Sequence, residues 1–135
     1  MTTAYTTWTP RLLSILRIVS AYLLLVHGTA KLLGIPHVTM FDSLQIASMY
    51  GVAGLIELIF GALLLVGLFS RVSAFIASGF TAAAYFIGHV AASGNLLLPI
   101  LNSGEAAVLF CFVFLYLAVA GPGPWSLDAM RNTSK

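Results

Sequence analysis

Four long apolar segments joined by short connections constrain this chain more than any other feature of its sequence. They cover approximately residues 11–33, 47–69, 72–92 and 103–120. A helix needs about 20 mainly apolar residues to cross the hydrocarbon core of a bilayer. The last segment is the shortest, and about 18 residues at ~1.5 Å each still reach ~27 Å. We therefore predict one all-α integral membrane domain over residues 1–135, folded as an up-down four-transmembrane-helix bundle.

The charge content supports a membrane location. Only 7% of the residues are charged and 60% are hydrophobic, whereas a soluble domain carries roughly 25% charged residues. The net charge of +2 and the isolated basic residues argue against nucleic-acid binding. A single cysteine, Cys111, excludes an intrachain disulfide and a dithiol centre formed by this chain alone. The predicted partner is the lipid bilayer.

The basic residues predict the orientation of the bundle. One side carries Arg11, Arg17, Arg71, Arg131 and Lys135, and the other side carries only Lys31. The positive-inside rule then places both termini in the cytoplasm and makes 121–135 a cytoplasmic tail. Arg17 lies near the cytoplasmic end of its helix, and we expect its side chain to reach the inner lipid phosphates.

Several ionisable residues lie inside or beside these apolar segments. Each costs about 2.5–3.5 kcal/mol near the centre of a membrane helix, so each calls for a partner or a cavity. The helical period puts His27 and Lys31 in one sector of the first helix. In the second helix Glu57 shares a face with two glycines, Gly54 and Gly61, which allow a neighbouring backbone to approach and shield the carboxylate.

The other two helices add polar groups at a similar depth. Tyr85 belongs to a stripe of small and hydroxyl-bearing residues on the third helix, with His89 near its edge, and Asn102 and Glu105 open the fourth. The alternating helix directions bring these groups together in the outer half of the bundle. The candidate catalytic residues are His27, Lys31, Glu57, His89 and Glu105, and the candidate ligand contacts are Asn102, Tyr85, Gly54 and Gly61.

Simpler alternatives remain open for most of these residues. Lys31 could extend to the outer headgroups, and His27 could be neutral and bonded to a backbone carbonyl. Asn102 and Glu105 have the spacing of a capping box, which would need no ligand. His89 could lie at the membrane interface. Glu57 has no interface or helix end near it and is predicted to be paired or functional.

Four sequence fragments resemble those of a known family. They are "HGTAKL" at 27–32, "GLIELIFGALLLVGLFSR" at 54–71, "NSGEAAVLF" at 102–110 and "GPGPWSLD" at 121–128. In this order they resemble the DoxX family of the wider DoxX/DoxD-like group, over roughly residues 11 to 130. The resemblance implies a four-helix, multi-pass protein of the bacterial inner membrane. Pro124 stands where the family commonly has a basic residue, so a role for positive charge there is not carried over.

The resemblance also implies a loose link to redox chemistry. Relatives are linked to thiosulfate:quinone oxidoreductase, as a small subunit, and to oxidative-stress complexes. We therefore expect a quinone-linked redox subunit or an oxidative-stress accessory protein. His27 or His89 would bind a quinone oxygen and carry protons, Lys31 would stabilise an oxyanion, and the two glutamates would relay protons. The aromatic side chains expected to line a slot for the quinone tail are Phe60, Phe86 and Phe112.

Other functions stay open at this stage. Buried carboxylates and histidines also mark proton-coupled transport pathways, although four short spans would have to oligomerise for that purpose. A non-catalytic scaffold would present Arg71 and the tail residue Asp128 to a soluble partner. His27 and His89 could bracket a haem, as a minor alternative. No metal site is predicted, because the E-x-x-H and H-x-x-x-H patterns are missing.

Overall fold

The computed structural model describes residues 2–133, and its regular structure is helical throughout that range. The elements in chain order are α1 (Thr2–Leu33), the 3₁₀ turn η1 (Thr39–Phe41), α2 (Met49–Val66), α3 (Ser70–Ala84), the π-helical η2 (Tyr85–Val90), α4 (Ala91–Ser93), α5 (Pro99–Asn102), α6 (Glu105–Ala120) and α7 (Leu127–Thr133). Because α3, η2 and α4 are continuous, they form one rod. No strand occurs in the described residues, which confirms the predicted all-α class.

Three helical segments are long and apolar enough to cross a membrane: Thr3–Leu33, Met49–Val66 and Ser70–Ser93. These helices agree with the predicted membrane class. The fourth, α6, is apolar but has only 16 residues, a length of ~24 Å against a hydrocarbon core of about 30 Å. The count of four spans and the orientation of the termini therefore stay predictions.

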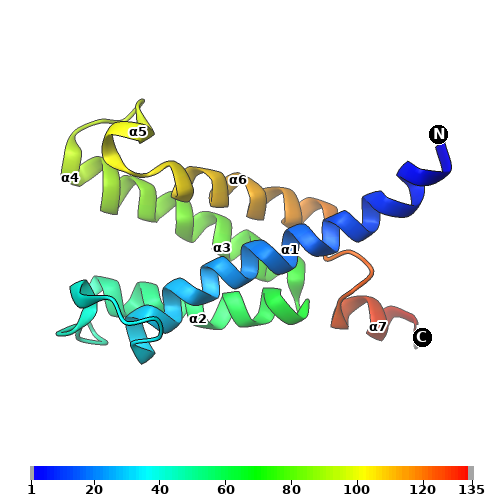
Figure 1. Ribbon diagram of the computed structural model, residues 1–135, viewed down its shortest axis with the longest axis horizontal. Coiled ribbons are helices and arrows are strands. Elements are labelled where there is room, and N and C mark those ends of the chain that lie inside the picture. Colours follow the sequence, from blue (N-terminus) through cyan, green and yellow to red (C-terminus); the bar gives the residue numbers. More distant parts are fainter. Residues whose placement is uncertain (1, 134–135) are drawn as a thin grey trace.

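The helices pack as two antiparallel pairs, α1 with α2 and α3 with α6 (Figure 1). The pairs come together at the end of the molecule that carries α7, here called the tail end. They diverge at the opposite end, here called the loop end, which carries the connections 34–48 and 94–104. Both termini lie toward the tail end, and the first turns of α1 project beyond the other helices.

Glycines allow α1 and α2 to touch along their backbones. A Cβ atom added to Gly28 would lie 2.6 Å from the backbone nitrogen of Leu58, and one added to Gly61 would lie 2.9 Å from the Cα of Leu25. Such distances are too short for any side chain larger than hydrogen. The α1–α2 pair therefore depends on small residues, as helix pairs in membranes commonly do.

The buried apolar core is formed toward the tail end. Its members are Ala21, Leu24, Leu64, Ala74, Ala77, Phe114 and Leu117. All four helices contribute alanine or leucine there, and Phe114 of α6 is fully buried in the same cluster. The core therefore fixes the two pairs at one end of the bundle and leaves the loop end without comparable packing.

The helix boundaries differ from the predicted ones mainly at the N-terminus. The prediction began the first helix at residue 11, but α1 begins at Thr2 and continues through Pro10. Proline has no amide hydrogen, so one helical hydrogen bond is missing at this position. Two nearby threonine hydroxyls donate to other carbonyls of the same part of α1. The Thr7 hydroxyl donates to Thr3 O at 2.9 Å and the Thr9 hydroxyl to Tyr5 O at 2.7 Å. The other predicted spans, 47–69, 72–92 and 103–120, differ from α2, the α3–α4 rod and α6 by at most three residues at each end.

A polar cleft between two helix pairs

A buried ion pair joins α1 to α2 near the loop end. Lys31 Nζ donates to both carboxylate oxygens of Glu57, each at 2.7 Å. The Glu57 residue is 6% exposed. Lys31 therefore points into the bundle, which decides between the two alternatives that the sequence left open. Its ammonium also lies 5.9 Å from the centre of the Phe41 ring, on the connection that follows α1.

Gly54 and Gly61 contribute space to this arrangement. A Cβ added to Gly54 would lie 3.0 Å from Lys31 Cβ. Gly54 therefore lets the stem of Lys31 cross α2 and reach Glu57, which is one turn further along. Gly61 packs against α1, as described above. Neither glycine lines the cleft described next, so their predicted role as ligand contacts is replaced by one in helix packing.

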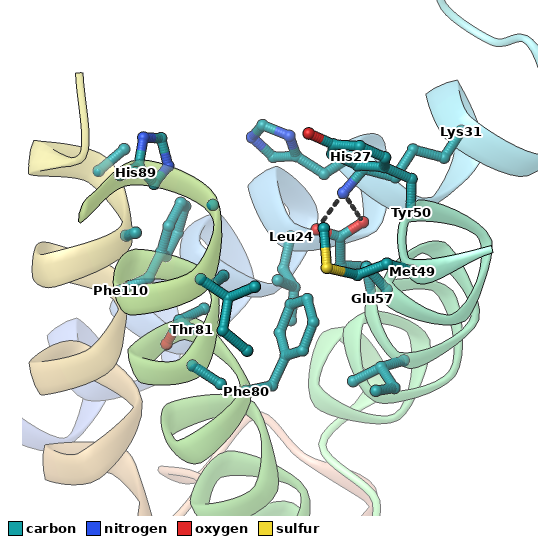
Figure 2. A pocket seen from close by; sticks show the side chains of 18 of the residues that line it. Leu24, His27, Lys31, Met49, Tyr50, Glu57, Phe80, Thr81, His89 and Phe110 are labelled. Carbon is teal, nitrogen blue, oxygen red and sulfur yellow. Dashed lines mark hydrogen bonds and ion pairs between the residues drawn. The ribbon is translucent and has the colours of Figure 1, made fainter. Parts of the chain in front are cut away.

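A cleft of about 440 Å³ lies between the two helix pairs in the loop-end half of the molecule (Figure 2). Its walls are mostly apolar, with Phe80 and Phe110 among the larger side chains. The polar groups His27, Lys31, Glu57 and His89 gather at one end of it. These four were all predicted site residues, and they come from α1, α2 and η2. The cleft exists because the pairs diverge beyond the core.

The cleft is open to the surroundings of the protein. Met49 and Val52 of α2 and Ile87 of η2 line it, and each is about half exposed. The exposed part of the rim is apolar, so a lipid-soluble molecule could enter between the pairs.

The aromatic wall differs from the predicted one. Phe60, Phe86 and Phe112 do not line the cleft, and the last two are exposed on the outside of the bundle. Phe80 and Phe110 take that position instead. Thr81, Ala106 and Ala107 also line the cleft. The sequence carries no local signal for this choice, because Phe60 also stands beside small residues, Gly61 and Ala62, and does not line the cleft. Which phenylalanines line it depends on which helices pair.

The π-helical turn η2 carries His89. The backbone amide of Ala91 donates to Phe86 O, five residues earlier, which is the π-helical pattern. A π-turn changes the direction of the residues that follow it, and such turns occur frequently at functional sites. His89 consequently lines the cleft, and its Nδ1 lies 2.9 Å from Asn102 O.

Asn102 and Tyr85 hold the connection between α4 and α6. Asn102 Nδ2 donates to Asn95 O at 2.8 Å and to Tyr85 Oη at 3.3 Å, while its Oδ1 accepts from the Gly104 amide at 2.8 Å. The Tyr85 hydroxyl donates to Leu96 O at 2.7 Å. Both side chains are buried but do not line the cleft. They support His89 from behind.

Glu105 fits neither of the two predicted roles. It is exposed, it does not line the cleft, and its carboxylate makes no hydrogen bond within residues 2–133, so the capping box with Asn102 is not formed. The cause is the tight turn before α6, in which Asn102 bonds to Gly104 instead. Glu105 remains in the first turn of α6, where a negative charge favours the helix dipole.

Arg17 corrects another expectation. Its side chain does not reach the lipid phosphates: it is 1% exposed and binds four backbone carbonyls. It donates to Pro122 O at 2.9 Å, to Leu65 O at 2.8 Å, and also to Leu64 O and Trp125 O. Arg17 therefore ties the end of α2 to the segment before α7. Five fixed donors suit this role better than a single ammonium.

The two residues predicted to face a soluble partner make hydrogen bonds within this chain, and their contact with a partner stays a prediction. Arg71 donates to Ala118 O at 3.0 Å and to Val119 O, near the end of α6. The Asp128 carboxylate accepts from the Phe69 amide at 3.0 Å and the Ser70 amide at 2.8 Å, so it caps α3. Burial alone would raise the pKa of Asp128, but these hydrogen bonds and the nearby Arg131 outweigh it and lower that pKa.

Comparison with known proteins agrees with this architecture. The DoxX family model matches residues 12–90, which include α2 and most of α1 and of the α3–α4 rod. The chain is 47% identical over 120 residues to a protein of Haemophilus influenzae (strain ATCC 51907 / DSM 11121 / KW20 / Rd), described as an uncharacterized protein; the match covers 88% of this chain and 90% of that one. No solved structure matches the chain significantly. The family match covers more than half of the residues, and the chain therefore belongs to the DoxX family.

Proposed function

We propose that the cleft binds the ring of a quinone-type molecule, and that the chain is the membrane subunit of a quinone-linked redox system. The observation that carries this proposal is the distribution of polarity in one cleft of about 440 Å³. That volume falls within the range of small-molecule sites, about 300–1,000 Å³. Ionisable side chains occupy one end and apolar side chains the rest, which matches a polar ring with an apolar tail.

Each polar residue has a chemical role in this proposal. Lys31 has three N–H donors and uses two of them on Glu57, so the third can bind a quinone oxygen and stabilise negative charge on it. His27 and His89 supply ring nitrogens that can carry protons between the ring and the loop end. Phe80 and Phe110 would contact the ring or the tail.

The electrons would come from a partner. Reduction of a quinone takes two electrons and two protons, and we propose that a redox protein bound at the membrane supplies the electrons. The DoxX-family chain would then hold the quinone and manage its protons. This is the redox-complex role expected from the family resemblance.

We further propose that α6 is a fourth membrane span and that both termini are cytoplasmic. The α6 helix pairs along its length with the α3–α4 rod, which is long enough to span. The apolar α5 segment lies before it and would occupy the missing depth in the outer leaflet. Arg11, Arg71 and Arg131 all belong to the tail end, which the positive-inside rule assigns to the cytoplasm.

Ligand binding can be tested by filling the cleft. The protein in lipid nanodiscs is dialysed against decyl-benzoquinone, and the bound fraction is measured for Ala84→Phe and Ala92→Phe. Ala84 lines the cleft, whereas Ala92 is exposed and does not. Because overpacking costs about 1–3 kcal/mol, we expect Ala84→Phe to bind about tenfold or more weakly. Ala92→Phe should bind normally.

Two further variants test the polar end. Glu57→Gln weakens the interaction that positions Lys31, and His27→Ala removes an imidazole from the polar end of the cleft. Both should weaken quinone binding. Unchanged binding in both variants, or equal binding by the two phenylalanine variants, would contradict the proposed function.

A further inference from the structure

The hydrogen bond of His89 fixes which of its ring nitrogens carries a proton. Its Nδ1 lies 2.9 Å from Asn102 O, and a carbonyl oxygen can only accept a hydrogen bond. Nδ1 therefore carries the proton. In the neutral ring, whose one proton is on Nδ1, Nε2 is a hydrogen-bond acceptor.

Nothing in the described part of the chain uses that acceptor. His89 Nε2 has no hydrogen-bond partner among residues 2–133, although His89 lines the cleft. The ring is also held firmly, because the Asn102 side chain is itself fixed by Asn95, Tyr85 and Gly104. The stacked ring of Tyr85, with centroids 6.4 Å apart, supports it from one side. His89 is thus an oriented acceptor with its second nitrogen available.

The opposite wall presents a donor. Lys31 lies across the cleft from His89, at the same end (Figure 2), and it has one N–H left after bonding to Glu57. The site therefore combines a donor from α1 with an acceptor from η2. A quinone has only carbonyl acceptors at its ring. It can accept a hydrogen bond from Lys31, but it has no hydrogen to donate to His89 Nε2, and the two lone pairs would repel each other. A hydroquinone satisfies both, since each hydroxyl can accept and donate.

We propose that the cleft prefers the hydroxyl-bearing, reduced form of its ligand, and that His89 determines this preference by accepting the ligand O–H. The proposal rests on the proposed function, because it requires a ring compound in the cleft. Asn102 acts as the positioning residue, through its carbonyl. Tighter binding of the reduced form also makes the bound ligand easier to reduce than the free one, by linkage.

The test compares three compounds on the same protein. Decyl-benzoquinone, its hydroquinone and the dimethyl ether of that hydroquinone are dialysed anaerobically against the protein in nanodiscs. We expect the hydroquinone to bind about tenfold more tightly than the quinone, the size of effect that one satisfied acceptor gives. The dimethyl ether cannot donate, so it should bind as weakly as the quinone. This comparison needs no variant and is unaffected by folding defects.

Variants then assign the preference to His89. His89→Phe keeps a flat ring but removes both nitrogens, and it should abolish the preference by weakening hydroquinone binding. His37→Phe is the matched control, because His37 is exposed on the 34–48 connection and contacts Asp42, away from the cleft. It should keep the full preference.

The outcomes separate this inference from the function on which it rests. If all three compounds bind equally, the preference is wrong and the quinone site stands. If the preference survives His89→Phe, the role of His89 is wrong. If none of the compounds binds, the proposed function itself fails.

Discussion

At the scale of single residues, the Lys31–Glu57 pair dominates the energetics of the site. Both side chains are about nine-tenths buried, and Glu57 lies in the middle of an apolar helix. A buried pair is costly to form, but removal of one partner leaves a charge without compensation. The pair therefore couples the position of α1 to that of α2 at the polar end of the cleft.

The first prediction concerns this coupling. Lys31→Met should destabilise the protein by about 3–5 kcal/mol, because Glu57 loses its partner. The double variant Lys31→Met/Glu57→Gln should recover much of that loss, since no unpaired charge remains. Reversible unfolding in mixed micelles measures the free energy of unfolding of the double variant and of the single variants Lys31→Met and Glu57→Gln. If the loss of stability in the double variant equals the sum of the two single losses, the residues do not interact.

At this scale, the sequence predicted correctly that Glu57 would be paired, but the partners expected for Arg17 were wrong. Glu57 could be identified because it is far from any helix end, so burial with a partner was the only inexpensive solution. Arg17 lies near a helix end, where the extended side chain can reach phosphates. Its partners are the backbone carbonyls of four residues, Leu64, Leu65, Pro122 and Trp125. Because every residue has a backbone carbonyl, the sequence cannot show which of them accept from Arg17.

At the scale of elements, the contact between α1 and α2 depends on Gly28. An added Cβ would meet only backbone atoms of α2, at 2.6 to 3.0 Å, and backbone cannot move aside locally. Gly79 of α3 has nothing within 4 Å of such an atom. The two positions therefore make a matched pair for the same substitution.

Gly28→Ala should destabilise the protein by about 1–3 kcal/mol through overpacking. Gly79→Ala should be neutral or stabilise it by about 0.5–1 kcal/mol, because alanine favours the helix. Unfolding in mixed micelles gives both values. A loss of stability in Gly79→Ala as large as that in Gly28→Ala would contradict the close backbone contact.

The attachment of α7 to α3 should depend on pH. The pKa of Asp128 is lowered in the folded protein, so its carboxylate contributes stability above the ordinary aspartate pKa of about 3.9, and this contribution is lost as the pH falls through the lower native value. We expect the unaltered protein to have a higher Tm than Asp128→Asn at neutral pH. The difference should shrink below about pH 4.

The matching control is Asp42→Asn, on the exposed 34–48 connection, where the carboxylate contacts His37. Thermal unfolding of the three proteins between pH 3 and pH 7 measures the effect. A difference between Asp128→Asn and the unaltered protein that persists unchanged at pH 3 would contradict the capping role of the carboxylate.

At the scale of the whole molecule, the sequence predicted the long helices, but not how they divide into pairs. Apolar length and helical period are local properties, so the long helices and the faces of His27, Lys31 and Glu57 could be predicted. The division into two pairs depends on the fit of Gly28 and Gly61 against a particular neighbour. The π-turn before Ala91 was not predicted either, because the apolar pattern of 72–92 fits an ordinary α-helix. For these reasons the cleft walls were only partly predicted.

The last prediction tests the proposed path of the chain through the membrane. In a Cys111→Ser background, single cysteines replace Ser43, Ser93 and Asn132, which are exposed in the 34–48 connection, at the end of α4 and in α7. If α6 spans the membrane, residues 43 and 93 lie outside and residue 132 lies inside. A membrane-impermeant maleimide should then label the first two in intact cells, and residue 132 only after the inner membrane is permeabilised.

Because α6 measures only ~24 Å, it could instead lie along the surface, and residues 93 and 132 would then be labelled from the same side. Labelling of residue 132 in intact cells together with residue 93 would thus reject the fourth span, whereas the reverse pattern for all three sites would keep four spans and reverse the orientation.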